Sequence, residues 1–422
     1  MGRLTTSTNQ WTFTQKIFFR FFFVYFVFYC FPFPIVSFEF TQPVTYPFME
    51  FMEWLVPKVG KLFFNWEISN SKFAFRLADS PFGVVYLFIN FILASLVTLL
   101  WSIIDRRRIN YEKLNSWFLL YLRYCLAFGM FEYGMNKIFP GQGGFITASV
   151  LERPIGMMDG TTFQWKFLAY SNAYKVFTGL GEVIGGILIL WRRTATFGAM
   201  LLMGVLSVVV MLNFCFGIGV KFSSMHYLFI TLIVLWNDRK RLLNLLLLNK
   251  TATPLNYTSL IHSPVWSRVL SAFLIVLVVC RMYQLIERNN KYWKRASLFD
   301  KKPLYGIYTT DYFIRSTDTT LPLQTDSLRW KKITIDGVLS SRIYVHLSTD
   351  DVISNPIRID TLQKTIQFAI KKDSLTLNWF KPDPNRLFFS GKWNNDSIKV
   401  MMKKYDLNNY PLYREKFQWI YD

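Results

Sequence analysis

Long apolar blocks alternate with short polar links over the first 290 residues. Seven of these blocks are close to the length that a helix needs to cross the hydrocarbon core of a bilayer. They lie at residues 15–36, 82–104, 117–138, 174–191, 197–216, 223–237 and 268–286. The pattern predicts an all-α membrane bundle with about seven transmembrane helices.

The pattern changes beyond residue 290, where apolar and polar positions alternate with a period of two. Ile343, Val345 and Leu347 show this alternation, and turn-forming pairs such as Asp336–Gly337 separate the runs. Such runs are typical of short antiparallel strands. We therefore predict a C-terminal all-β soluble domain, a small barrel or a sandwich. A barrel filled by its own side chains would act as a docking module, whereas a hollow one would hold a lipid.

These patterns divide the chain into four segments. Residues 1–116 contain two spans and an outer loop at 37–81, and residues 117–249 contain four spans in close succession. Residues 250–289 contain an interfacial segment and the last span, and residues 290–422 form the β domain.

Basic residues at the ends of the spans indicate the orientation. Four clusters fall on one side if the N-terminus is cytoplasmic, as the positive-inside rule requires. They contain Arg3, Lys16 and Arg20, then Arg106 to Arg108, then Arg192 and Arg193, and finally Arg239 to Arg241. A fifth cluster, from Arg288 to Arg295, disagrees. Seven crossings then place the β domain on the outer side, which would be the periplasm if the membrane is the inner membrane of a bacterium.

Composition excludes several classes of function. The formal net charge is +21, but the basic residues flank the spans and form no compact stripe with aromatic residues, so a nucleic-acid partner is not expected. The four cysteines lie in predicted spans without a CxxC pair, and the three histidines lack ligand spacing. No nucleophile, metal or thiol-pair constellation is evident. We therefore do not expect an enzyme, and leave the question open.

Among the ionisable residues within the predicted spans, four are candidates for a polar site, namely Arg123, Glu132 and Lys137 in the third span and Glu182 in the fourth. A charge at mid-bilayer costs about 2.5–3.5 kcal/mol on insertion scales, so these side chains must face protein or water. At 100° per residue, Arg123 and Lys137 share one stripe of the third span and Glu132 lies opposite Arg123.

Counting residues from the inner end of each span predicts an inner Arg123–Glu182 pair. A second, outer group would contain Lys137, Asn213 and His226, with Glu132 as a further candidate. The glycines of a close-packing motif, Gly181 and Gly185, flank Glu182. The polar cluster has two interpretations, a ligand or quinone-type site and a lock that fixes helix register.

Two sequences in this region resemble those of bacterial DoxX-like membrane proteins. The first is RYCLAFGMFEYGMNKIF, with Arg123, Gly134 and Lys137 at the matching positions. The second contains GLGEVIGG, with Gly179, Glu182, Gly185 and Gly186, and ends in the turn Arg192–Arg193–Thr194. The resemblance covers 117–249, the four-helix core of that family, and the tail looks like the C-terminal domain of some members.

The large outer loop, the β tail and the lack of a nucleophile or metal constellation favour a membrane-embedded partner or assembly subunit of a larger envelope complex. Some DoxX-like proteins are quinone-linked membrane subunits of sulfur or thiol oxidoreductases, so a quinone- or lipid-linked subunit is the alternative. A small-solute or proton transporter is a second alternative. This chain has no cysteine outside its predicted spans, unlike thiol-redox relatives. No cofactor is expected, with quinone or lipid left open, and the expected partners are the lipid bilayer and a membrane or periplasmic protein.

Overall fold

The computed structural model describes residues 10–69, 72–139, 141–252, 260–261, 263–338, 341–370, 373–393 and 396–414, so Arg3 lies outside the described residues. The chain forms two compact units. The helical unit contains Met1–Ile138 and Val176–Glu287, and the barrel unit contains Phe139–Lys175 and Arg288–Asp422. The segment between the third and fourth predicted spans is therefore part of the unit that contains the β domain.

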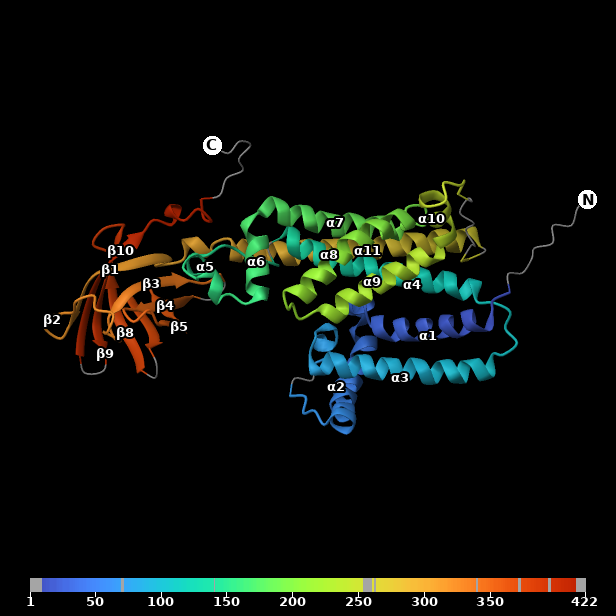
Figure 1. Cartoon of the computed structure of the whole chain (residues 1–422), viewed down its shortest axis with the longest axis horizontal. Helices are drawn as coiled ribbons and strands as arrows, with labels where there is room; N and C mark the ends of the chain where they lie inside the picture. The colour runs from blue at the N-terminus through green and yellow to red at the C-terminus, as the bar shows by residue number, and fades with distance from the viewer. Residues whose placement is uncertain are drawn as a thin grey trace, which may run out of the picture. The chain divides into compact units, whose positions relative to one another are not determined.

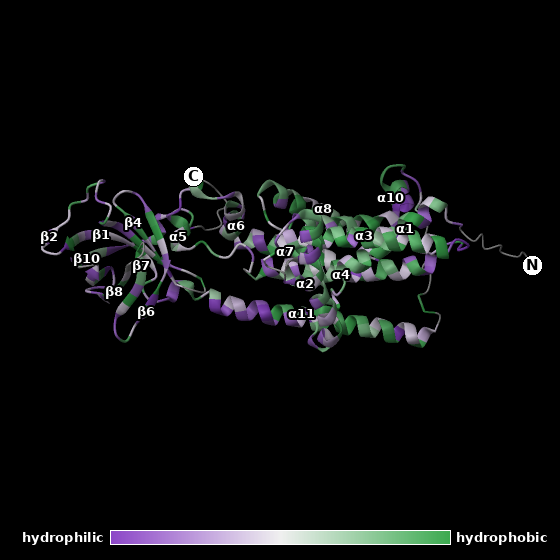
Figure 2. Cartoon of the chain, turned by 90° about the horizontal axis from the view of Figure 1, so that it is seen from below, coloured by the Kyte–Doolittle hydropathy of each residue, from purple (hydrophilic) through white to green (hydrophobic). Residues whose placement is uncertain are grey.

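A helix occupies each of the seven apolar blocks (Figure 1). These helices are α1 (Phe13–Cys30), α3 (Pro81–Ile104), α4 (Glu112–Ile138), α7 (Asn172–Leu190), α8 (Ala195–Cys215), α9 (Lys221–Asn237) and α11 (Pro264–Ala296). Within the described residues, α1, α3, α7, α8 and α11 are long and apolar enough to cross a membrane. The α4 helix is more polar, and α9 has only 17 residues. Figure 2 shows that α11 is apolar over its first half and polar toward its C-terminal end.

One further long helix, α2 (Gln42–Phe64), lies within the predicted outer loop at 37–81. Its buried face, with Met52 and Val56, packs against Phe82 and Tyr86 of α3. Figure 1 shows it running across the direction of α1 and α3. The shorter elements of this unit are η1 (Ile35–Ser37), η2 (Glu39–Thr41), η3 (Phe73–Leu77) and α10 (Arg239–Leu246).

Glycines allow α4 and α7 to approach closely. A Cβ added to Gly134 would lie 2.6 Å from the carbonyl oxygen of Gly179, and one added to Gly179 would lie 2.7 Å from that of Gly134. Of the two glycines in the predicted packing motif, Gly185 presses against Leu202 of α8, whereas Gly181 has only an ordinary contact with Val205 at 3.6 Å. The tightest backbone approach therefore uses Gly134 and Gly179 rather than the predicted pair.

The barrel unit contains one antiparallel sheet in the order β5-β4-β3-β1-β10-β9-β8-β7-β6, with β2 paired to β1 at the side. The Asn355 side chain on β5 donates a 2.8 Å hydrogen bond to the Ala369 carbonyl oxygen on β7, so the sheet is nearly closed. The predicted all-β domain is confirmed, and it is a barrel. The strands are β1 (Gly306–Arg315), β2 (Asp318–Thr319), β3 (Trp330–Asp336), β4 (Arg342–Leu347), β5 (Val352–Pro356), β6 (Arg358–Asp360), β7 (Thr365–Ile370), β8 (Asp373–Phe380), β9 (Arg386–Trp393) and β10 (Asp396–Tyr405).

Side chains fill the interior of the barrel. The alternate apolar residues of the strands point inward, as the period of two predicts. Trp330 is completely buried, and its ring lies against the rings of Phe313, Phe368, Phe389 and Trp393 at centroid distances of 5.9–6.5 Å. These packed side chains are those expected of the filled type of barrel.

The segment between α4 and α7 is fastened to the barrel. It contains α5 (Ala148–Leu151), η4 (Ile155–Met157) and α6 (Gly160–Tyr170). The Ala148 backbone N–H donates to the Tyr305 hydroxyl at 3.0 Å, and the Ser149 backbone N–H donates to the Asp336 carboxylate at 2.9 Å. Glu152 pairs with Lys332 at 2.5 Å. Burial raises the pKa of Tyr305, which keeps its hydroxyl protonated. Two short elements, η5 (Phe299–Lys301) and η6 (Leu407–Asn409), complete the unit.

Candidate functional site

A buried ion pair joins α4 and α7. The Lys137 ammonium donates to Oε1 of Glu182, whose side chain is completely buried. The close approach of the two backbones at Gly134 and Gly179 brings these side chains together. The second carboxylate oxygen, Oε2 of Glu182, is also buried and has no hydrogen-bond partner among the described residues. A carboxylate with an unused acceptor inside a protein is unusual, so this oxygen can accept a hydrogen bond from water or a hydroxyl group.

The predicted Arg123–Glu182 pair is wrong. Arg123 instead donates from Nε to the Ile189 carbonyl oxygen at 2.6 Å and from Nη2 to the Leu190 carbonyl oxygen. The last carbonyls of a helix have no partner within the helix and carry partial negative charge, so they can hold a cation. Counting residues from the inner ends of the spans gave the wrong partner for Arg123. The reason is that α4 begins at Glu112 and that the Gly134–Gly179 contact fixes the register of α4 against α7. That register brings Arg123 to the end of α7 rather than to Glu182.

Glu132 belongs to a different contact. It pairs with Arg281 of α11 at 2.5 Å, on the face of α4 opposite Arg123. Glu132 thus points toward another helix, as its place opposite Arg123 allows, and the ion pair connects α4 to the last helix. Sequence reasoning did not select Arg281. The available signal was an arginine inside the last apolar block, which needs a partner just as the charges in the third block do.

His226 and Asn213, the other members of the predicted outer group, have surroundings of their own. The His226 ring stacks on Tyr29 at a centroid distance of 4.1 Å, and its Nε2 shares a 2.7 Å hydrogen bond with the Tyr25 hydroxyl. These contacts join α9 to α1. Asn213 is buried on α8, and its Nδ2 has no hydrogen-bond partner among the described residues. The contacts of Lys137 and His226 therefore lie on different helices, α7 and α1.

The buried charges of the helical unit mainly contact one another or backbone carbonyls. Each charge named above meets an opposite charge or a backbone carbonyl on another helix. The described residues contain no group of three or more His, Cys, Asp and Glu side chains that could hold a metal ion. The interior of the helical unit is thus a set of ion pairs that connect helices, with one carboxylate oxygen of Glu182 available to a hydrogen-bond donor.

Apolar helices of spanning length and a filled antiparallel barrel define this chain as a helical membrane protein with a folded β domain. It belongs to the same family as the uncharacterized protein YwoB of Bacillus subtilis (strain 168), with 38% identity over 123 residues. The alignment covers 29% of this chain and 78% of YwoB. No protein-family model matches the chain, and no solved structure does. YwoB is itself uncharacterized, so this kinship brings no activity with it.

Proposed function

We propose that this chain is a membrane-embedded partner or assembly subunit of a larger envelope complex, and that its barrel unit docks the partner. The filled barrel carries the proposal. Because Trp330 and its neighbouring rings pack inside the barrel, we expect recognition to use the outer surface. We also propose that the chain is DoxX-like and lies in a bacterial inner membrane. Its N-terminus is then cytoplasmic and its barrel periplasmic.

The connection between the two units adds support. The segment that is fastened to the barrel by Ser149 and Glu152 continues directly into α4 at one end and into α7 at the other. These are the helices that hold the Lys137–Glu182 pair. A partner bound to the barrel unit would therefore act on a segment that is covalently continuous with the core of the bundle.

The surface of the barrel unit offers apolar positions to a partner. Leu321 and Leu323 are exposed on the loop between β2 and β3, and Leu362 is 94% exposed on the turn between β6 and β7. Single exposed leucines are ordinary, but two on one loop form a small apolar contact surface.

Site-specific photocrosslinking tests this function. A photoreactive amino acid is placed at Leu321 or Leu362, with Leu96 on the exposed face of α3 as the control. We expect a discrete, stoichiometric adduct from the barrel positions in native membranes, and the same partner after mild detergent extraction. A monodisperse monomer that gives no adduct from either barrel position would refute the docking role.

A second candidate, a quinone- or lipid-linked subunit of an oxidoreductase, has one supporting observation. Oε2 of Glu182 can accept a hydrogen bond, and a quinol hydroxyl is a suitable donor. Purified protein should then retain quinone, and Glu182→Gln should lower the amount retained. If extraction finds no quinone and added quinone leaves the melting temperature unchanged, this candidate is eliminated.

A further inference from the structure

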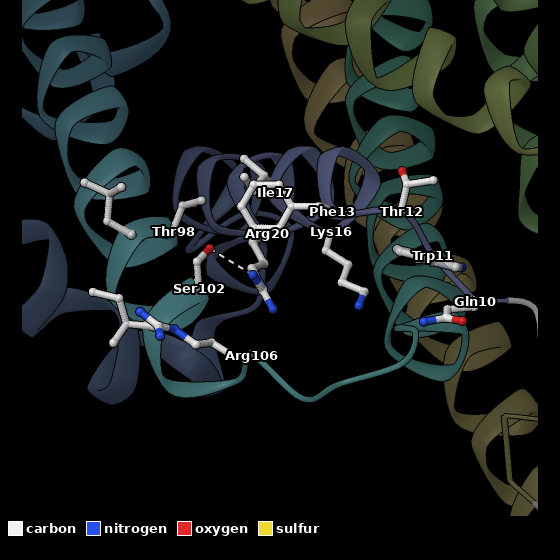
Figure 3. Close-up of a pocket in the computed structure, with 12 residues that line it drawn as sticks. Gln10, Trp11, Thr12, Phe13, Lys16, Ile17, Arg20, Thr98, Ser102 and Arg106 are labelled. Atoms are coloured by element: carbon white, nitrogen blue, oxygen red, sulfur yellow. Dashed lines mark hydrogen bonds between the residues drawn. The ribbon is translucent and has the colours of Figure 1, made fainter.

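A pocket of about 910 Å³ lies between the beginning of α1 and the end of α3 (Figure 3). Three of its twelve lining residues, Lys16, Arg20 and Arg106, are basic, and none is acidic. Figure 3 shows Lys16 and Arg106 on either side of Arg20. The concentration of positive charge with no lining carboxylate indicates that an anion is the complementary ligand.

Arg20 is the buried member of this charge cluster, and hydrogen bonds hold its side chain in place. It is 2% exposed, and its guanidinium donates to the Ser102 hydroxyl at 2.8 Å, to the Asp105 carbonyl oxygen at 2.9 Å and twice to the Tyr111 hydroxyl. The Asp105 carboxylate lies outside the lining and accepts from the Tyr111 hydroxyl at 2.7 Å. A guanidinium has five N–H groups, so these four bonds leave one N–H on Nη1 within the described residues.

The rest of the pocket is apolar and belongs to helices of spanning length. Phe13 of α1 is 72% exposed, and Leu99 and Ile103 of α3 are about 60% exposed. Because α1 and α3 are both long and apolar enough to cross a membrane, their ends lie at the boundary between headgroups and acyl chains. A ligand that matches the pocket therefore has an anionic end and an apolar chain.

We propose that this pocket binds an anionic phospholipid. Its headgroup phosphate lies among Lys16, Arg20 and Arg106, and the first part of an acyl chain lies against Leu99 and Ile103. Basic residues at the ends of membrane helices attract anionic headgroups, and the preformed Arg20 network avoids the entropy cost of ordering that side chain on binding. Free phosphate would satisfy the charges but would leave the apolar wall uncovered. The proposal goes beyond the docking function and does not depend on it.

Lipid binding to the full chain in detergent tests the proposal. The test variant is Lys16→Gln/Arg106→Gln, which removes both rim charges and leaves the Arg20 network intact. The matched control is Arg107→Gln, next to Arg106 in sequence but outside the lining. Native mass spectrometry measures bound lipid after addition of phosphatidylglycerol or of phosphatidylcholine with the same acyl chains. We expect the double variant to bind phosphatidylglycerol about thirtyfold more weakly, and the control to bind it as the parent does.

Three results would overturn the proposal. The first is that the parent and the double variant retain equal amounts of phosphatidylglycerol. This holds when the double variant without lipid melts at the same temperature as the parent. The second is equal retention of phosphatidylglycerol and phosphatidylcholine by the parent. The third is protection against thermal unfolding by inorganic phosphate alone that equals protection by phosphatidylglycerol, since this would make the pocket a site for free phosphate.

Discussion

Lys137 on α4 and Glu182 on α7 form an ion pair that is enclosed within the helical unit. The Glu182 side chain has no exposed surface, and the pair lies beside the contact between Gly134 and Gly179. Each charge alone would be costly in this apolar environment, so each depends on the other. The pair therefore stabilises the register of α4 against α7 that the contact between Gly134 and Gly179 sets.

Removing one partner should be strongly destabilising. Lys137→Met leaves Glu182 buried and uncompensated, and we expect a loss of about 3–5 kcal/mol in unfolding free energy. The double variant Lys137→Met/Glu182→Leu should recover much of this loss, as measured by denaturation in detergent. Lys331→Met, which breaks an exposed pair with Asp350, is the control and should change stability by less than about 1 kcal/mol. A double variant as unstable as Lys137→Met would show that the two charges do not depend on each other.

Arg123 should be energetically independent of Glu182. Arg123→Met removes the donors to the Ile189 and Leu190 carbonyl oxygens and should destabilise the protein, because it exposes the end of α7 to an apolar environment without partners. Combined with Glu182→Gln, the two losses should add within about 0.5 kcal/mol in a double-mutant cycle. A coupling energy much larger than this would support the Arg123–Glu182 pair that the sequence predicts.

The sequence predicted the helices well and the partners of their charges poorly. Apolar blocks of spanning length identified the position of each long helix except α2, whose two internal prolines and mixed composition obscured the pattern. Partners depend on helix register, which close glycine contacts set across residues distant in sequence. The stripe through Arg123 and Lys137 was correct helical geometry, but the estimated depth relative to Glu182 had no information about Gly134 and Gly179.

In the barrel unit, alternation with a period of two was sufficient to predict strands, because inward side chains fill the core. The attachment of residues 139–175 could not be predicted. It depends on Asp336 and Tyr305, which lie more than 150 residues from their partners Ser149 and Ala148, and neither pattern nor spacing connects such positions.

The contact between α4 and α7 should be sensitive to a single methyl group. Gly134→Ala places a Cβ 2.6 Å from the Gly179 backbone oxygen, and relief requires the two helices to separate, so we expect a loss of about 1–3 kcal/mol. Gly204→Ala on α8 is the matched control, because a Cβ there meets nothing within 4 Å and alanine favours the helix. Thermal unfolding in detergent measures both. Equal melting temperatures of the Gly134→Ala and Gly204→Ala variants would contradict the close approach of the α4 and α7 backbones.

The attachment of residues 148–152 to the barrel should depend on Asp336. This carboxylate accepts from the backbone N–H and the hydroxyl of Ser149, and Asp336 is only 4% exposed. In Asp336→Ala, we expect faster hydrogen exchange of the α5 amides while the strands keep their protection. Asp350→Ala, on an exposed turn, is the control and should leave α5 unchanged. Unaltered exchange in Asp336→Ala would mean that the other contacts hold the segment without it.

The stability of the barrel should fall with decreasing pH through His346 on β4. Burial lowers the pKa of His346 below its ordinary value of 6.5, with a smaller opposing effect from the Glu152 carboxylate. The folded protein therefore binds this proton less readily than the unfolded chain does. The stabilising effect of neutral His346 is complete above pH 6.5 and is lost as the pH falls toward the lower pKa of the folded state.

Local measurement separates this effect from the titration of the other histidines. Hydrogen exchange of the β3 and β4 amides in the full chain, corrected for intrinsic rates, should reveal more frequent opening at pH 5.5 than at pH 7.5. His346→Gln removes the titrating group and keeps a polar side chain of similar reach, so the pH-dependent part of this opening should shrink. His226→Gln, on α9 of the helical unit, is the control and should leave the β3 and β4 profile as it is in the parent. If His346→Gln retains the full pH dependence, another group is responsible, and the burial of His346 has no role in it.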